Sequence, residues 1–115
     1  MSLETRVSNI IKSTKKWVTH TGDKYDNLIK IEILVNKELV YRVILELENC
    51  MAQVIVEEPQ CAPYKNVALE VVGMEDGRVN DIYSWYDKGD ENISEILFQL
   101  DKGIKFAFNY GHKHN

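Results

Sequence analysis

The stretch IKIEILVNKELVYRVILELE, residues 29–48, decides the fold of this chain. Its apolar side chains recur at every second position, from Ile29 to Val35 and again from Leu39 to Leu47. Successive side chains of a strand point to opposite faces of a sheet, so each run suits a half-buried strand. Residues 36–38 are polar and stand between the runs. Two alternating runs joined by a short turn predict an antiparallel hairpin.

More strand segments follow this hairpin. Val54 and Val56 belong to a third, residues 67–71 to a fourth, and residues 79–86 to a fifth that is rich in aromatic side chains. A turn over residues 73–77, with a glycine at each end, separates the last two. Consecutive strands joined by short turns predict an antiparallel meander.

Apolar residues at helical spacing stand on both sides of the strand region. The first stripe predicts a helix over residues 3–20, ended by the glycine at position 22. A second stripe begins at Ile93 and predicts a helix that ends near Gly103. Alternation over residues 104–108 then favours a short sixth strand. The first stripe consists of Leu3, Val7, Ile10, Ile11, Thr14, Trp17 and Val18.

These elements define the fold class. The chain of 115 residues is expected to form a single α+β domain with one core. Its sheet is an antiparallel five- to six-stranded meander, flanked by an N-terminal and a C-terminal helix. We expect both helices to pack on one concave face of the sheet. Val40, Ile44 and Ile55 then lie on the other face, as a surface for a partner or for a homodimer.

Charge is unevenly distributed along the chain. The net charge is −4, but residues 1–37 carry seven basic and four acidic side chains, whereas residues 41–100 carry four basic and twelve acidic ones. An acidic chain is a poor ligand for nucleic-acid phosphate. No apolar run approaches the ~20 residues that span a bilayer, and the N-terminus does not resemble a signal peptide. We expect a cytoplasmic protein that binds neither nucleic acid nor membrane.

The sequence favours no metal or cofactor. Cys50 and Cys61 have ten residues between them and form no CxxC pair, so we interpret them as free thiols in two turns. His112 and His114 provide two ligands at the end of the chain, which is too few for a closed metal site.

No catalytic set can be recognised either. The sequence contains no GxSxG, GxGxxG or P-loop motif. Among its paired carboxylates, Glu46 and Glu48 alternate with apolar residues, as on a solvated sheet face. We therefore predict no catalytic residues, and we regard a role other than an enzyme as the better hypothesis.

The remaining hypothesis is a non-enzymatic, acidic protein-interaction module of the inhibitor, immunity or assembly-chaperone type. Such a protein presents carboxylates and aromatic side chains to a basic protein partner, because complementary charge speeds encounter and fixes register. Exposed tyrosine and tryptophan also favour a protein partner. The candidate partner-binding residues are Glu46, Glu48, Glu57, Glu58, Asp87 and Asp90 for charge, with Trp85 and Tyr86 as aromatic anchors.

An alternative comes from the aromatic residues on the inward face. A small-molecule-binding domain or small enzyme would enclose an apolar pocket between the curved sheet and the helices. That pocket would be lined by Trp17, Tyr41, Tyr83 and Trp85.

Overall fold

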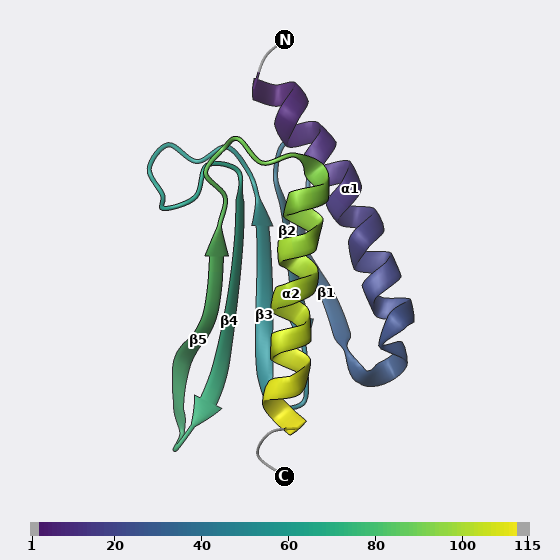
Figure 1. Ribbon diagram of the computed structural model, residues 1–115, viewed down its shortest axis with the longest axis vertical. Coiled ribbons are helices and arrows are strands. Elements are labelled where there is room, and N and C mark those ends of the chain that lie inside the picture. The colour runs from purple at the N-terminus through teal and green to yellow at the C-terminus, as the bar shows by residue number, and fades with distance from the viewer. Residues whose placement is uncertain (1–2, 113–115) are drawn as a thin grey trace.

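The computed structural model describes residues 3–112 and confirms the α+β class. Five strands form one antiparallel sheet in the order β1-β2-β3-β4-β5, with a helix before the first and after the last (Figure 1). The elements are α1 (Leu3–Lys24), the short 3-10 helix η1 (Asp26–Leu28), β1 (Lys30–Asn36), β2 (Tyr41–Glu46), β3 (Cys50–Val56), β4 (Val67–Glu75), β5 (Arg78–Tyr86) and α2 (Ile93–His112).

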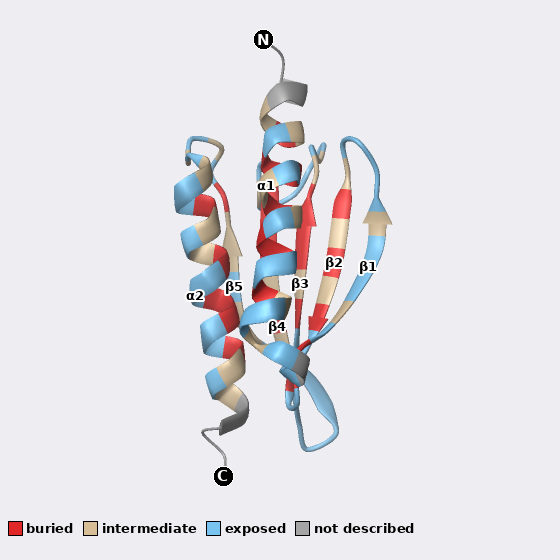
Figure 2. Cartoon of the chain, turned by 90° about the vertical axis from the view of Figure 1, so that its right-hand side faces the viewer, coloured by how far each residue is buried: buried red, intermediate tan, exposed pale blue. Residues whose placement is uncertain are grey.

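Both helices lie on the same face of the sheet, as expected (Figures 1 and 2). We call this the inner face and the opposite one the outer face. In β2 the predicted alternation holds, because Tyr41, Val43 and Leu45 are buried while the residues between them are partly exposed. The stripe of α1 from Val7 to Val18 is buried against this face. The core therefore occupies the layer between the helices and the inner face.

Helix α2 is longer than predicted, and the sixth strand is wrong. Residues 104–108 continue the helix, with Ile104 and Ala107 buried and Phe106 exposed. Gly103 lies inside α2 instead of ending it. A Cβ at this position would lie 2.1 Å from Cδ2 of Leu69 in β4. The glycine therefore lets the helix backbone approach the sheet closely.

Helix α1 also continues past its predicted end at residue 20, to Lys24. Gly22 lies within the helix, and the chain turns instead at η1, where Asp26 has a φ of 51°. Aspartate tolerates this left-handed conformation better than most residues do.

Each edge strand carries an irregularity in its pairing. The β1–β2 register shifts between Ile33 and Val35, and the β4–β5 register shifts between Val71 and Val72. A bulge interrupts the alternation of side chains between the two faces. Strand β1 also reaches beyond the cover of the helices, so that 52% of Ile33 is exposed. The alternation predicted for residues 29–35 is therefore only partly reflected in burial.

Candidate protein-binding surface

The outer face of the sheet is free of both helices (Figure 2). Its side chains form three cross-strand rows over β2, β3, β4 and β5, named here by their height in Figure 1. The upper row is Arg42, Ile55, Ala68 and Tyr86; the middle row is Ile44, Gln53, Glu70 and Ser84; the lower row is Glu46, Met51, Val72 and Asp81.

A loop over residues 57–66 covers part of the upper row. Its Tyr64 stacks on Tyr86, with ring centroids 6.2 Å apart and planes inclined by 24°. Ile55 is only 9% exposed, although no helix lies above it. The expectation that Ile55 offers surface to a partner is therefore wrong, because the chain's own aromatic loop lies over this end of the face. Val40 and Ile44 are partly exposed.

Carboxylates hold both tyrosines in place. The Tyr64 hydroxyl donates a short hydrogen bond to Glu57, and Glu57 also pairs with Arg42 at 3.2 Å. The Tyr86 hydroxyl donates to Glu70 at 2.7 Å. Burial, followed by the bond to Glu57 and its negative charge, raises the pKa of Tyr64 to about 12. The bond to Glu70 is the main cause of the raised pKa of Tyr86.

The lower row borders an open cavity of about 290 Å³. Glu46 and Glu48, two of the predicted residues, line it together with Met51, Val72 and the β4–β5 hairpin. Met74 and Val79, a cross-strand pair of that hairpin, are each 64% exposed. The hairpin extends beyond β3. The β3–β4 pairing ends at Cys50 and Gly73, whereas β4 and β5 stay paired as far as Glu75 and Arg78. We call this cavity the lower groove.

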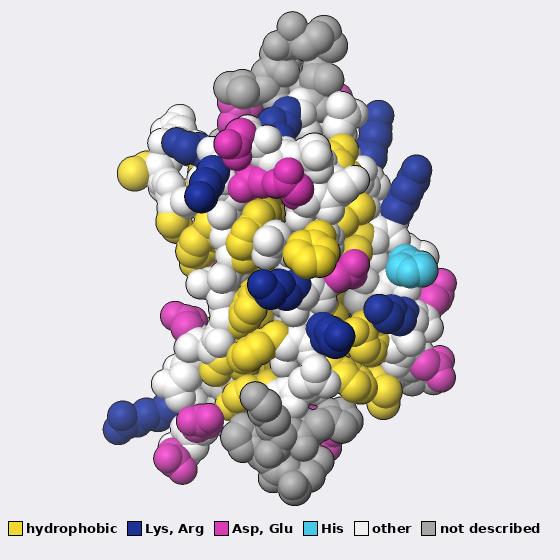
Figure 3. Space-filling view, in the orientation of Figure 1, with side chains coloured by type: hydrophobic (Ala, Val, Ile, Leu, Met, Phe, Trp, Pro, Cys, Tyr) yellow, Lys and Arg dark blue, Asp and Glu magenta, His cyan; other side chains and the backbone are white. Residues whose placement is uncertain are grey.

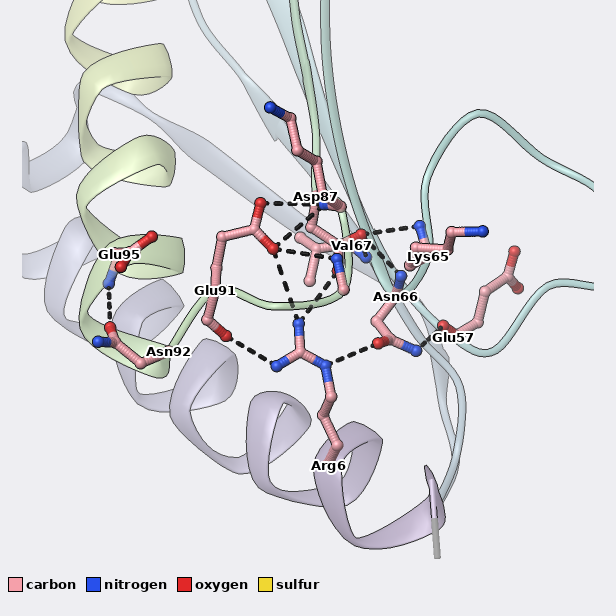
Figure 4. Close-up of polar contacts among 11 residues, drawn as sticks. Arg6, Glu57, Lys65, Asn66, Val67, Asp87, Glu91, Asn92 and Glu95 are labelled. Carbon is pink, nitrogen blue, oxygen red and sulfur yellow. Dashed lines mark hydrogen bonds and ion pairs between the residues drawn. The ribbon is translucent and has the colours of Figure 1, made fainter.

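Asp87 is not a surface carboxylate, contrary to the prediction. It is 2% exposed, and its Oδ1 accepts hydrogen bonds from the backbone N–H groups of Lys65, Asn66 and Val67 at 2.7–2.9 Å. Its Oδ2 pairs with Arg6 of α1 at 3.2 Å (Figure 4). This carboxylate therefore joins α1 to the ends of β4 and β5, and it is not accessible to a partner.

Arg6 connects this cluster to the start of α2. Its guanidinium donates to the Glu91 carbonyl at 2.7 Å and to the Asn66 side chain at 2.9 Å (Figure 4). The Glu91 carboxylate accepts from the backbone N–H groups of Lys88 and Gly89, and Asn92 caps α2 by accepting from Glu95 N–H at 2.8 Å. The cluster therefore has a structural role.

Trp85 and Asp90 lie elsewhere. Trp85 is on the inner face, because it pairs with the buried Leu69, and both predicted residues line an open cavity of about 330 Å³ beside α2. Phe98 of α2 lines the same cavity and is 63% exposed. The helical side that it belongs to also carries scattered lysine and arginine side chains (Figure 3).

The predicted residues thus fall into separate places. Glu46 and Glu48 lie at the lower groove, while Glu57 and Tyr86 lie at the upper row. Four residue steps of β2, from Arg42 to Glu46, separate the upper row from the lower row, which corresponds to about 13 Å. Glu58 is exposed in the loop that follows Glu57.

Sequence reasoning missed several residues of these surfaces. Tyr64 stands alone in a polar loop, and nothing local indicates that it folds back onto the sheet. Glu70 alternates with buried residues of β4, so its outward position could have been found. Phe98 lies off the apolar stripe of α2, and an off-stripe aromatic residue is a usable signal of exposure. The other residues missed were Met51, Val72, Met74 and Val79.

Two residues of the alternative pocket belong to the packed core. Trp17 and Tyr41 are buried, and the Trp17 indole donates to Asp101 at 2.7 Å. Tyr83 packs against Phe106 of α2 with ring centroids 5.1 Å apart. The space between the sheet and the helices is therefore occupied by side chains at these positions, which favours a surface site over an internal one.

Both cysteines are free thiols. Cys50 is buried and donates to the Ala107 carbonyl at 3.3 Å, and burial raises the pKa of its thiol. Cys61 is exposed. Among residues 3–112, no group of three or more His, Cys, Asp or Glu side chains is arranged to hold a metal ion. His114 lies outside the described residues. Neither described helix has the length and apolarity that crossing a membrane requires.

Comparison of the chain with protein-family models, with curated proteins and with solved structures gives no match.

Proposed function

We propose that this protein is a protein-interaction module that binds a basic protein partner through the outer face of its sheet. The observation that carries the proposal is a sheet face left free by both helices, on which stacked tyrosines lie among carboxylates. The role is that of an inhibitor, immunity protein or assembly chaperone, which acts by covering a surface of its partner.

The tyrosines suit this role because they are held before binding. Tyrosine supplies a large amphipathic contact area and loses little side-chain entropy on binding. The hydrogen bonds to Glu57 and Glu70 fix the rings further. Partly exposed Ile44 and Gln53 continue the surface between the two ends of the face.

The charge of the face suits a basic partner. The segment from β1 to β5, residues 30–86, carries ten acidic and five basic side chains, whereas α1 carries two acidic and five basic ones. Arg42 neutralises part of the charge of Glu57, but Glu46, Glu70 and Asp81 extend down the same face. A cationic partner is attracted to the face, and added salt should slow the encounter.

Site-specific photocrosslinking in the native host tests this proposal. A photoreactive residue at Gln53, in the middle row, should capture one defined protein, whereas the same residue at Lys16, exposed on α1, should not. Replacing Glu70 by lysine should weaken the captured complex, and its association rate should fall with salt. Capture from Lys16 and not from Gln53, or binding that ignores both Glu70→Lys and salt, would contradict the proposal.

A further inference from the structure

We propose that the lower groove binds a short segment of a partner in which an apolar side chain stands beside lysine or arginine. The inference rests on the proposed function, since it names the chemistry that one part of the outer face recognises. The apolar side chain packs on Met51, Val72, Met74 and Val79, while the cation pairs with Glu46 and Glu48.

The apolar part of the groove is large and adaptable. Met74 and Val79 are each 64% exposed, and Met51 is 38% exposed. Covering these side chains removes apolar surface from water, which favours binding. Methionine also adjusts its shape to different ligands, because it is unbranched and flexible. The volume of about 290 Å³ and the open wall suit one inserted side chain better than an enclosed small molecule.

The polar rim carries negative charge. The ten described residues that line the groove include Glu46 and Glu48 and contain no lysine or arginine. Asp81 adds a third carboxylate as the cross-strand neighbour of Val72. Lys30 is the cross-strand neighbour of Glu46 and offsets part of this charge.

The nearest basic residue of β5 points the other way. Arg78 is the cross-strand neighbour of Glu75 in the β4–β5 ladder. The Glu75 carboxylate accepts a hydrogen bond from Tyr110 of α2 at 2.8 Å. This pair therefore belongs to the helical side of the hairpin. An apolar floor with carboxylates at its rim is complementary to a basic, apolar segment.

Methionine methyl spectroscopy provides a direct test. Two of the three methionines of the chain, Met51 and Met74, line the groove. Their methyl signals, assigned with Met51→Leu and Met74→Leu, should shift when the wild-type protein is titrated with the peptide Gly-Lys-Leu-Arg-Gly. The matched peptides Gly-Lys-Ser-Arg-Gly and Gly-Glu-Leu-Glu-Gly should bind much more weakly. Signals that stay unmoved, or equal binding of the serine peptide, would overturn the proposal.

Charge-reversal variants separate a local effect from one of net charge. Combined Glu46→Lys and Glu48→Lys should weaken binding of the lysine–leucine–arginine peptide by about tenfold. Combined Asp23→Lys and Glu38→Lys changes the net charge equally at exposed positions outside the groove and should leave the affinity unchanged. Equal weakening in both variants would overturn the proposal. Self-association of the protein alone, abolished by the first variant, would make a second copy the occupant and would also overturn it.

The two proposals can fail separately. If Gln53 captures a partner whose affinity is insensitive to Glu46→Lys and Glu48→Lys, the proposed function stands and the groove is not its recognition site. If the peptide moves the Met51 and Met74 signals but no partner is captured at Gln53, the groove binds its ligand and the proposed function fails.

Discussion

Arg6 near the start of α1 and Asp87 just after β5, 81 positions apart in the sequence, form an ion pair of 3.2 Å. Asp87 also accepts hydrogen bonds from three backbone N–H groups, so its negative charge is compensated inside the fold. This pair fixes the N-terminal helix to the end of the sheet.

Replacing Asp87 by asparagine should lower the free energy of unfolding by about 2 kcal/mol, because the charge opposite Arg6 is lost while an oxygen acceptor remains. Asp87→Ala should cost more, about 3–5 kcal/mol, since it also removes the acceptor of three N–H groups. Asp90→Asn is the matched control at an exposed position and should change stability by less than about 0.5 kcal/mol. Urea denaturation measures all three. Equal effects of Asp87→Asn and Asp90→Asn would rule out the structural role of Asp87.

The close approach of α2 to β4 gives a second prediction. Gly103→Ala should destabilise the protein by about 1–3 kcal/mol, because the new Cβ would lie 2.1 Å from Cδ2 of the fully buried Leu69. Gly22→Ala in α1 is the control. There the added Cβ meets the tip of the partly exposed Ile31 at 2.9 Å, and alanine is the better helix former. Thermal unfolding should show a loss for the first variant and no loss for the second.

Thr14 offers a stabilising change. Its hydroxyl is buried in α1 and has no hydrogen-bond partner among the described residues. Thr14→Val keeps the shape and removes this unsatisfied group, so the free energy of unfolding should rise by about 1 kcal/mol. Thr19→Val is the matched control, since the Thr19 hydroxyl is exposed and donates to the Lys15 carbonyl. A gain in Thr19→Val as large as in Thr14→Val would contradict the explanation.

The bond between Tyr64 and Glu57 should be visible in a pH titration. Tyrosine ordinarily ionises with a pKa near 10, and the pKa of Tyr64 is raised to about 12. Because the folded-state pKa lies above the unfolded one, this stabilising contribution is complete below pH 10 and is lost as the pH rises towards 12. Phenolate absorbance should show a late-titrating tyrosine that is lost in Tyr64→Phe and that ionises earlier in Glu57→Gln. An unchanged titration in that variant would show that Glu57 is not a cause.

The two thiols should differ in reactivity. Cys61 is exposed, whereas Cys50 is buried under α2 with a raised pKa, and the thiolate is the reactive form. A thiol reagent such as Ellman's should therefore modify one thiol quickly and the second only after unfolding. Cys61→Ser should abolish the fast phase, and Cys50→Ser should leave it intact.

Periodicity predicted the sheet well where one face is covered. In β2 the buried and partly exposed residues alternate as the sequence does, because the helices lie over its inner face. The same argument failed for residues 104–108, where Ile104, Phe106 and Phe108 fit a strand and Ile104, Ala107 and Phe108 fit a helix equally well. In such a short segment the sequence fits both the helical and the strand period, and burial of Ile104 and Ala107 in the core favours the helix.

The candidate surface was predictable only in part. The outward positions of Glu46 and Tyr86 follow from alternation along single strands. The burial of Asp87 could not be foreseen, because the groups that hold it come from residues 65–67 and from Arg6. The covering of Ile55 depends likewise on a loop whose path is set by tertiary contacts.

The bulges in β1 and β5 affect how copies of this chain can associate through the edges of their sheets. Unpaired strand edges invite sheets of neighbouring molecules to join into fibres, and a kink in an edge spoils the long regular ladder that such growth needs. Both ends of this sheet are interrupted in that way. The free outer face can therefore stay open without the sheet also offering two regular edges for polymerisation.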